Sequence, residues 1–316
     1  MATEFGHAST TDEVISGVRL DGKTAVVTGG SAGLGVESGR VLAAAGANVV
    51  MLGRDAGRLA AAVEGIGAEL PAASVSMEIM DLADLASVRA AAERLREACA
   101  QIHILLNNAG VMACPLARTK DGFELQFGTN HLGHFLFTCL LLPSLVAAAP
   151  ARIVNLSSAG HKLGDIDFDD PNFERREYDK WLAYGQSKTA NALFSVALNE
   201  RLAGQGVTAN AVHPGMIMTE LGRHLEPADI EILQARSGAM DIAFKSVPAG
   251  AATSIWACTS AELEGRGGLY LEDCHIAEPV SEANPAGGVA AHAQDRAAAE
   301  RLWELSEQLV GERFAT

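Results

Sequence analysis

The feature that most constrains the fold is an alternation of short apolar segments with amphipathic ones along most of the chain. Residues 23–30, KTAVVTGG, are rich in β-branched side chains and end in glycine, which predicts a buried strand and then a turn. Similar strands are predicted at 48–54, 74–82, 102–110, 151–158, 207–215 and 267–273, with helices between them. This order is typical of parallel βαβ units. We therefore expect an α/β fold with a doubly wound parallel sheet and helices on both faces.

The chain is long enough for one large core or two small ones. It has 316 residues, 48% of them hydrophobic and 20% charged. No internal repeat and no convincing linker occur before about residue 276. We expect a single domain over 1–316, with the main body at 20–275 and an extension at 276–316. In that extension Leu302, Leu305 and Leu309 share one helical face, which predicts a helix that docks on the body.

Charge and cysteine usage exclude several classes of protein. The net charge of −15 leaves no basic footprint for a nucleic acid. The five cysteines are scattered and never form a CxxC pair, which favours reduced thiols in a cytoplasmic protein. Residues 1–20 lack the apolar stretch of a secretory signal. The most apolar run, 135–149, is interrupted by Pro143 and predicts a buried helix, too short to span a membrane.

A glycine-rich loop, TGGSAGLG, joins the first predicted strand to the first helix. Glycine at positions 29, 33 and 35 permits a tight turn and a close approach of the backbone to a pyrophosphate. The N-terminus of the helix would then face the anion with free N–H groups. A mere tight turn is the alternative. In this strand–turn–helix context we expect a dinucleotide site that includes Gly29, Ser31, Ala32, Gly33, Leu34 and Gly35.

The tip of the second strand bears on which dinucleotide is bound. In NAD-binding folds an acidic residue at this place holds the ribose 2′-hydroxyl. Here the sequence reads Gly53-Arg54-Asp55. Arginine suits a 2′-phosphate by charge and shape, which favours NADP(H). Asp55 is open to two interpretations, as a ribose ligand that favours NAD(H) or as the N-cap of the next helix.

Six motifs in a fixed order carry a family resemblance. They are TGGSAGLG, NNAG at 107–110, TNHLGHF around Asn130, NLSS ending at Ser158, YGQSK at 184–188 and HPG at 213–215. Together they resemble the short-chain dehydrogenase/reductase family, in its simpler branch of roughly 250 residues, over about 20–275. YGQSKTANALF, VHPGMIMTEL and the long segment between Ser158 and Tyr184 are most similar to retinol-dehydrogenase-like reductases that use NADP(H). The resemblance implies a single-domain Rossmann fold.

The resemblance also implies a catalytic set. Tyr184 would donate a proton to the substrate oxygen, Ser158 would hydrogen-bond that oxygen, and Asn130 would position a water. Lys188, one helical turn from Tyr184, would hold the nicotinamide ribose and lower the pKa of the phenol, which is near ~10 when free. Such a Tyr–Lys pair also occurs on helix surfaces without any chemical role. Ser157 is the rival of Ser158, because a shift of one residue on a strand turns the side chain to the other face.

Further cofactor contacts follow from the same resemblance. Asp81 and Leu82 would flank the adenine. The turn after the fourth strand would line the ribose, although it also reads as a simple glycine-ended turn; its residues are Asn108, Ala109 and Gly110. The nicotinamide end would be held by Pro214, Gly215, Ile217 and Thr219, with Tyr184 and Lys188. The segment at about 219–247 would form a lid over a hydrophobic substrate, with a plain core helix as the alternative.

We therefore expect an oxidoreductase that interconverts a hydrophobic ketone or aldehyde and its alcohol. A catalytically silent NADP(H)-binding regulatory protein is the alternative. We expect no metal: the acidic insert from Asp165 lacks the glycine and glutamate of a calcium loop and reads as solvated, and two histidines, His131 and His134, have no third ligand in view. Family members often form homodimers or homotetramers through the helices with the Asn and Tyr motifs. The insert after Ser158 would block that surface.

Overall fold

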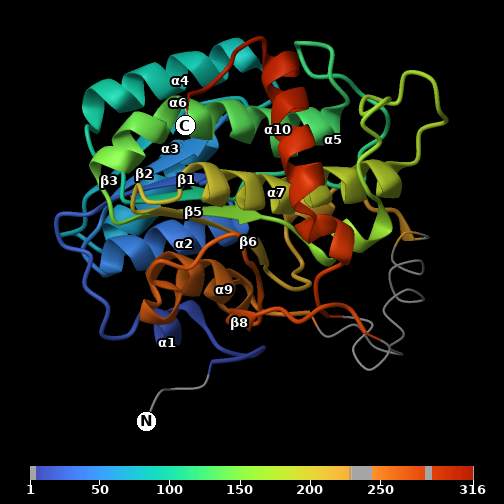
Figure 1. Cartoon of the computed structure of the whole chain (residues 1–316). Helices are drawn as coiled ribbons and strands as arrows, with labels where there is room; N and C mark the ends of the chain where they lie inside the picture. Colours follow the sequence, from blue (N-terminus) through green and yellow to red (C-terminus); the bar gives the residue numbers. More distant parts are fainter. Residues whose placement is uncertain (1–4, 228, 230–243, 282–286, 316) are drawn as a thin grey trace.

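One sheet dominates the molecule (Figure 1). The computed structural model describes residues 5–227, 229, 244–281 and 287–315. Within them the strand order is β3-β2-β1-β4-β5-β6-β7-β8; β8 is antiparallel to β7 and all other pairs are parallel. The doubly wound α/β fold is confirmed. The strands are β1 Thr24–Thr28, β2 Asn48–Gly53, β3 Val75–Ile79, β4 Ile104–Asn107, β5 Ala151–Leu156, β6 Val207–His213, β7 Tyr270–Glu272 and β8 His275–Ile276.

Helices cover both faces of the sheet because its central strands are apolar on both sides. In β1, Val26 packs on one face while Ala25 and Val27 pack on the other. One face carries α1 Thr11–Ile15, α2 Gly33–Ala44, α3 Ala56–Glu69 and α9 Val247–Thr259. The other carries α4 Leu85–Ala98, α6 Gly133–Ala147, α7 Lys180–Arg201 and α10 Arg296–Val310.

The apolar run around Pro143 forms part of one continuous helical segment, Leu125–Ala147. It consists of α5 (Leu125–Phe127), the π-helical turn η1 (Gly128–Leu132) and α6. By length and composition alone its 23 residues could cross a membrane, but 78% of the apolar window is buried inside the molecule. The predicted buried helix is confirmed, but the expectation that it is too short for a membrane was wrong, because α5 and η1 extend it to Leu125 and Pro143 does not end it. The segment is a core helix of the sheet's second layer.

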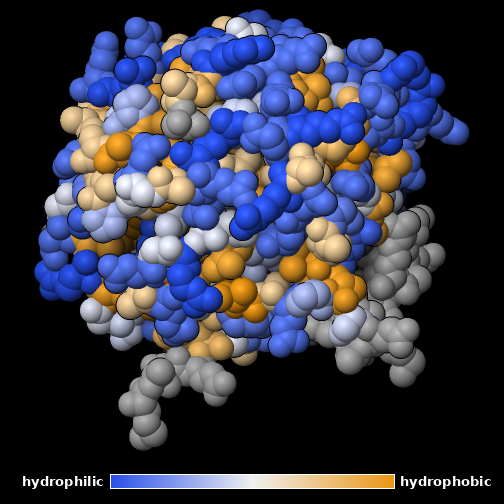
Figure 2. Space-filling view, in the orientation of Figure 1, coloured by the Kyte–Doolittle hydropathy of each residue, from blue (hydrophilic) through white to orange (hydrophobic). Residues whose placement is uncertain are grey.

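The C-terminal helix α10 packs against α7, as Figure 1 shows. Leu302 is buried, as predicted, but Leu305 and Leu309 are only partly buried; the buried face also holds Trp303 and Ser306. α10 therefore covers part of α7, the helix expected to pair in an oligomer. Figure 2 shows that the face with α10 and α4 is mainly hydrophilic, with small apolar areas among the polar residues.

Candidate active site

The expected site residues follow the carboxyl ends of neighbouring parallel strands. The strand order reverses between β1 and β4, so the loops after these strands diverge to opposite faces of the sheet. In open α/β sheets this switch point is where ligands bind. The glycine loop follows β1, NNAG ends β4, Ser158 follows β5 and HPG ends β6. The fold thus brings all four motifs to one edge of the sheet.

The glycine loop has the geometry of an anion site. Gly29 and Gly33 have φ of +70° and +53°, in the left-handed region that favours glycine. A Cβ on Gly35 would lie 2.1 Å from the Gly29 carbonyl oxygen, so only glycine fits there. α2 begins after Ala32 without a side-chain cap, whereas an aspartate caps α3, α4, α7 and α10. The first N–H groups of α2 are therefore free to bind a phosphate, which suits a dinucleotide.

The turn after β4 is tied directly to the glycine loop. The Thr28 hydroxyl oxygen accepts hydrogen bonds from the main-chain N–H groups of Asn108 and Ala109, at 2.9 and 3.0 Å. The Asn108 amide donates to the Thr28 carbonyl at 2.8 Å. A Cβ on Gly29 would lie 2.8 Å from that amide nitrogen. The two turns expected to hold the pyrophosphate and the ribose thus form one rigid unit.

Asn130 lies at the centre of the π-helical turn η1 and is fully buried. Its side chain accepts the Val111 N–H at 2.8 Å and donates to the Val111 carbonyl and the Ser187 hydroxyl, both at 2.9 Å. Its carbonyl oxygen lies 2.9 Å from Nδ1 of His134. The side chain of Asn130 therefore holds the chain after NNAG against α7, the helix that carries Tyr184. Only the main-chain carbonyl of Asn130 remains as a site for a water.

The structure distinguishes the two neighbouring serines. Ser157 is buried, and its hydroxyl donates to the Lys188 carbonyl at 2.8 Å. Ser158 is half-buried; its hydroxyl accepts the Gly160 N–H at 3.0 Å and lies close enough to the Tyr184 phenol to offset part of the rise in the pKa of that group. Gly160 makes room for this contact, because a Cβ there would lie 2.7 Å from the Tyr184 ring. Of the two serines, Ser158 faces Tyr184.

Tyr184 and Lys188 are both buried, at 4% and 3% exposure. The Lys188 ammonium lies 5.7 Å from the centre of the Tyr184 ring and donates to the Leu156 carbonyl at 3.0 Å. Burial raises the pKa of Tyr184 to about 12 and lowers the pKa of Lys188 to about 8. The expected lowering of the phenol pKa is wrong for this structure, because desolvation outweighs the favourable influence of Ser158.

The segment after β6 reaches back over the glycine loop. Gly215 has φ of +89°, and the Lys245 side chain packs against it. Ile217 pairs with Lys245 through the main chain. A Cβ on Gly33 would lie 3.4 Å from the Thr219 methyl group, so Thr219 lies beside the start of α2. The residues from Pro214 to Thr219 thus lie between the end of β5, which Ser158 follows, and the glycine loop. The resemblance places the nicotinamide there.

The two residues expected near the adenine follow β3. The Asp81 carboxylate accepts the Ala83 N–H at 2.9 Å, so it shapes its own turn. The Leu82 side chain is 6% exposed and packs in the core, with its carbonyl close to Gly133. An adenine ring would therefore meet the main chain of Leu82 instead of its side chain.

The end of β2 presents two exposed cations and one carboxylate that caps the next helix. Arg54 is exposed. Asp55 is the N-cap of α3 and accepts the Arg58 N–H at 3.0 Å, as the capping interpretation predicts. The Arg58 guanidinium reaches Glu220 at 2.5 Å. Arg58 is a second cation that the sequence analysis missed, although its place one turn after Arg54 is visible in the sequence.

The described part of the expected lid is anchored to the Tyr184 helix. The Asp229 carboxylate lies 2.7 Å from the Lys180 ammonium and 3.2 Å from the Trp181 indole nitrogen. Residues 228 and 230–243 of the expected lid lie outside the described residues, and Phe244 is exposed. No pattern in the sequence links Asp229 to the start of α7, because the partners are 48 and 49 residues apart.

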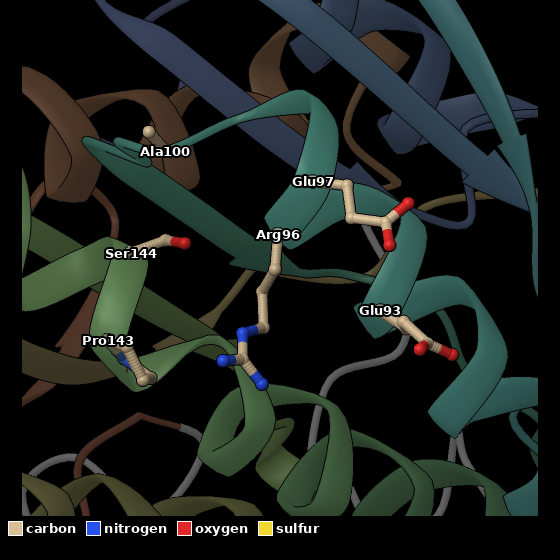
Figure 3. Close-up of a pocket in the computed structure, with 6 residues that line it drawn as sticks. All are labelled: Glu93, Arg96, Glu97, Ala100, Pro143 and Ser144. Atoms are coloured by element: carbon tan, nitrogen blue, oxygen red, sulfur yellow. The ribbon is translucent and has the colours of Figure 1, made fainter.

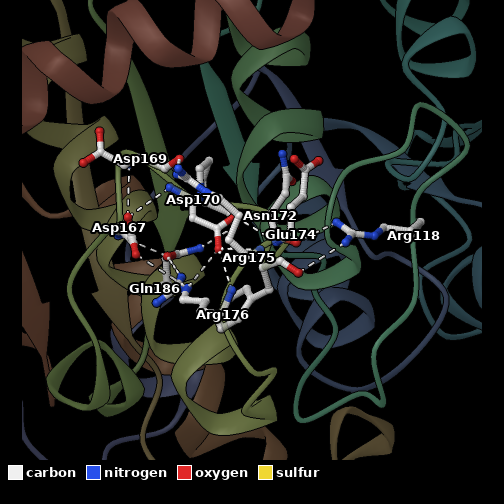
Figure 4. A network of polar contacts seen from close by, with 11 residues as sticks. Arg118, Asp167, Asp169, Asp170, Asn172, Glu174, Arg175, Arg176 and Gln186 are labelled. Atoms are coloured by element: carbon white, nitrogen blue, oxygen red, sulfur yellow. Dashed lines mark hydrogen bonds and ion pairs between the residues drawn. The ribbon is translucent and has the colours of Figure 1, made fainter.

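The acidic insert is a packed loop. Asp170 is 7% exposed and accepts N–H groups from Glu174, Arg175 and Arg176, while Asp167 accepts two others (Figure 4). Burial alone would raise the pKa of Asp170, but these backbone hydrogen bonds lower it. The expectation of a solvated insert holds for the exposed Asp165 and Asp169 but was wrong for Asp170, whose buried carboxylate organises the loop. Among the described residues no group of three or more His, Cys, Asp or Glu side chains could hold a metal.

One surface hollow lies elsewhere. It has a volume of about 450 Å³ and lies between α4 and α6 (Figure 3). None of the residues expected to bind substrate or cofactor contributes to it; its lining consists of Glu93, Arg96, Glu97, Ala100, Pro143 and Ser144.

Comparison with known proteins agrees with this geometry. The pattern of the short chain dehydrogenase family matches residues 23–229. The chain is 42% identical over 293 residues to human retinol dehydrogenase 13, covering 92% of this chain and 86% of that protein. It also resembles the crystal structure of an uncharacterised protein from Mycobacterium paratuberculosis, with 34% identity, 99% and 100% coverage and a TM-score of 0.75. A short chain dehydrogenase from Burkholderia cenocepacia in complex with NADP is 28% identical, with 80% and 97% coverage and a TM-score of 0.63.

The chain belongs to the short-chain dehydrogenase/reductase family. It is an oxidoreductase that acts on alcohol or carbonyl groups with a nicotinamide cofactor. Among its members it is similar to the retinol dehydrogenases.

Proposed function

We propose that the protein is an NADP(H)-dependent reductase and dehydrogenase that interconverts a hydrophobic ketone or aldehyde and its alcohol. Tyr184 is its general acid and base. The observation that carries this proposal is that three side chains come together: a Cβ on Gly160 would meet both the Tyr184 ring and the Ser158 hydroxyl, and the Lys188 ammonium lies 5.7 Å from the centre of that ring.

The bound cofactor supplies or accepts the hydride, and the protein handles the proton and the developing charge. Ser158 donates a hydrogen bond to the substrate oxygen, a type of contact whose loss costs about 2.7–4 kcal/mol in enzymes. Tyr184 gives that oxygen a proton when a carbonyl is reduced and takes it back when an alcohol is oxidised. Lys188 lies one turn away, so its charge stabilises the phenolate left behind. The buried setting keeps water from competing for these groups.

The cofactor preference rests on the end of β2. Gly53 offers no carboxylate to a ribose, and Asp55 uses one carboxylate oxygen to cap α3. The exposed guanidinium of Arg54 is then the group that meets a 2′-phosphate. The NADP-bound relative from Burkholderia cenocepacia supports the same assignment.

The proposed substrate class and location rest on exposed apolar residues, the names of the relatives and the state of the cysteines. Met218 and Phe244 are exposed apolar residues at the two ends of the expected lid, and they suit an apolar substrate. The retinol dehydrogenases to which the chain is similar are named for such an alcohol. All five cysteines are free, which fits the cytoplasmic location that we propose.

The first test is turnover by the Tyr184→Phe variant. NADPH and NADH oxidation is followed by absorbance with a panel of apolar ketones and aldehydes, and cofactor binding is followed by fluorescence. The variant should lose turnover and keep its affinity for NADPH, because the phenol acts only on the substrate oxygen. A variant with full activity would exclude Tyr184 as the proton donor. Cofactor binding by the wild type without any turnover would favour a silent regulatory protein.

Arg54→Ala tests the cofactor preference. It should weaken NADPH binding by about ten- to a hundredfold, as expected for loss of a charged hydrogen bond, and leave NADH binding unchanged. Arg19→Ala removes another exposed arginine away from the site and serves as the control. Equal effects of Arg54→Ala on the two cofactors would refute the 2′-phosphate assignment.

A further inference from the structure

His161 is a fully buried histidine that none of the steps above uses. It lies in the turn η2 (Ala159–Leu163), three residues after Ser158. Its Nδ1 atom is 2.7 Å from the Ser158 carbonyl oxygen. Its Nε2 atom is 3.0 Å from the main-chain nitrogen of Ala290, 129 residues later in the chain. The ring therefore connects the serine of the active site to the C-terminal extension.

The partners of the two ring nitrogens fix the tautomer. A main-chain N–H can only donate, so Nε2 must accept the hydrogen bond from Ala290 and carries no proton. The proton is then on Nδ1, where it is donated to the Ser158 carbonyl. Tyr270 adds a second contact, with its hydroxyl 3.0 Å from Nδ1. Burial lowers the pKa of His161 to about 4, so the ring is neutral near pH 7.

The segment that supplies the Ala290 N–H is itself held in place. The Gly288 N–H donates to the Glu272 carboxylate at 2.7 Å, and Val289 exchanges main-chain hydrogen bonds with Glu278 and Val280. Nε2 of His292 lies 3.0 Å from the His161 carbonyl oxygen. The extension thus forms hydrogen bonds with both the ring and the main chain of His161.

We propose that His161 is a positioning residue for Ser158, held in one tautomer by the main chain of Ala290. The proposal rests on the proposed role of Ser158 toward the substrate oxygen. The Ser158 carbonyl accepts the main-chain N–H of His161 at 3.0 Å as well as the Nδ1–H of its ring, so a movement of His161 shifts the serine main chain and, with it, the hydroxyl that faces Tyr184. Catalytic groups must be held within about 0.5 Å of their working positions. Residues 288–292 therefore support the active site from outside the matched family segment, 23–229.

Ala290→Pro removes the donor with little other change. Ala290 already has φ of −72° and ψ of 143°, which proline adopts without strain. Ala291→Pro is the matched control. Ala291 is exposed and is the first residue of the short helix η5 (Ala291–Gln294), where proline is well tolerated and no helical N–H bond is lost. Both variants should keep the wild-type melting temperature within a few degrees and the wild-type affinity for NADPH.

The kinetic readout separates positioning from folding. Ala290→Pro should lower kcat for carbonyl reduction about ten- to a hundredfold, as expected for a misplaced group, while Ala291→Pro should behave as wild type. In a Ser158→Ala background Ala290→Pro should cause no further loss. His161→Asn keeps an N–H close to the place of Nδ1 and should retain more activity than His161→Phe. A loss that persists without the Ser158 hydroxyl, or equal activity of the two proline variants, would overturn the proposal.

A spectroscopic readout is independent of turnover. ¹⁵N NMR of histidine-labelled protein reports which ring nitrogen carries the proton, with His161→Phe used to assign the signal. The wild type should show Nδ1–H for His161, and Ala290→Pro should shift the Nε2 resonance. An Nε2–H tautomer in the wild type would refute the positioning role. Absence of carbonyl turnover by a wild type with the Nδ1–H tautomer would refute the proposed function instead.

Discussion

Lys188 should weaken the fold in which it is buried, and Lys188→Met measures by how much. Its pKa falls from 10.5 to about 8 through burial. Each pKa unit corresponds to about 1.4 kcal/mol, so keeping this lysine charged at pH 7 costs the native state about 3 kcal/mol. Methionine has a similar length and carries no charge. The Leu156 carbonyl keeps a second donor, the Asn191 amide at 2.8 Å, so the substitution leaves no unpaired group there.

The variant should therefore raise the free energy of unfolding by up to about 3 kcal/mol at pH 7 while it abolishes turnover. The sign of the pH dependence follows from the lowered pKa. Between pH 8 and 10.5 the unfolded wild type binds more protons than the native one, so its stability rises with pH through that window. The advantage of Lys188→Met should shrink in the same window.

Urea unfolding of both proteins without cofactor, at pH 7 and pH 9.5, measures the difference. Lys120→Met removes a fully exposed lysine that pairs with Asp84, and it should leave the unfolding free energy nearly unchanged. The reasoning is refuted if Lys188→Met is less stable than wild type at pH 7. It is also refuted if the gap between them is the same at both pH values.

Two further substitutions test the loops. Gly35→Ala should lower the unfolding free energy by about 1–3 kcal/mol and abolish NADPH binding in a fluorescence titration, because its Cβ would meet the Gly29 carbonyl. The control is Gly65→Ala on α3, where a Cβ would have no atom within 4 Å; it should be neutral or stabilising. Asp170→Asn should cost about 1–3 kcal/mol at pH 7 in urea unfolding, since an amide cannot accept all three N–H groups. The difference in unfolding free energy between Asp170→Asn and wild type should vanish in acid, as pH falls below 3.8 through the lowered pKa of Asp170. Asp169→Asn, at an exposed position, should show no change in unfolding free energy.

The sheet and most of the site could be predicted because they depend on local patterns. Parallel strands are buried on both faces, so β1 and β4 appear as apolar runs. The residues that bind or react lie at the ends of these runs, where glycine or polar residues interrupt them. Once the strands are parallel, these ends meet at one edge of the sheet, and the motifs come together without further information.

Short or exceptional elements could not be predicted. α1 has 5 residues and β8 has 2, too few for a hydrophobic period. The apolar run around Pro143 predicts a helix, but it does not show that the π-helical turn η1 and α5 continue that helix back to Leu125. Asp170 looks like an exposed carboxylate in the sequence, and only the folded loop shows its three N–H partners. His161 depends on Ala290, a contact between distant segments that no spacing reveals.

Burial also explains why the pKa of Tyr184 was predicted in the wrong direction. Spacing shows that Lys188 is one turn from Tyr184, but it does not show that both side chains are buried. In a buried site desolvation favours the neutral form of each group, so the pKa of the phenol rises as that of the ammonium falls. The phenol then keeps its proton near pH 7, which is the state that can reduce a carbonyl. Oxidation of an alcohol needs the phenolate, so in that direction the charge of Lys188 and the Ser158 hydroxyl beside the phenol matter most. Lys188 thus destabilises the fold and serves the reaction for the same reason, because it holds a positive charge in a buried site.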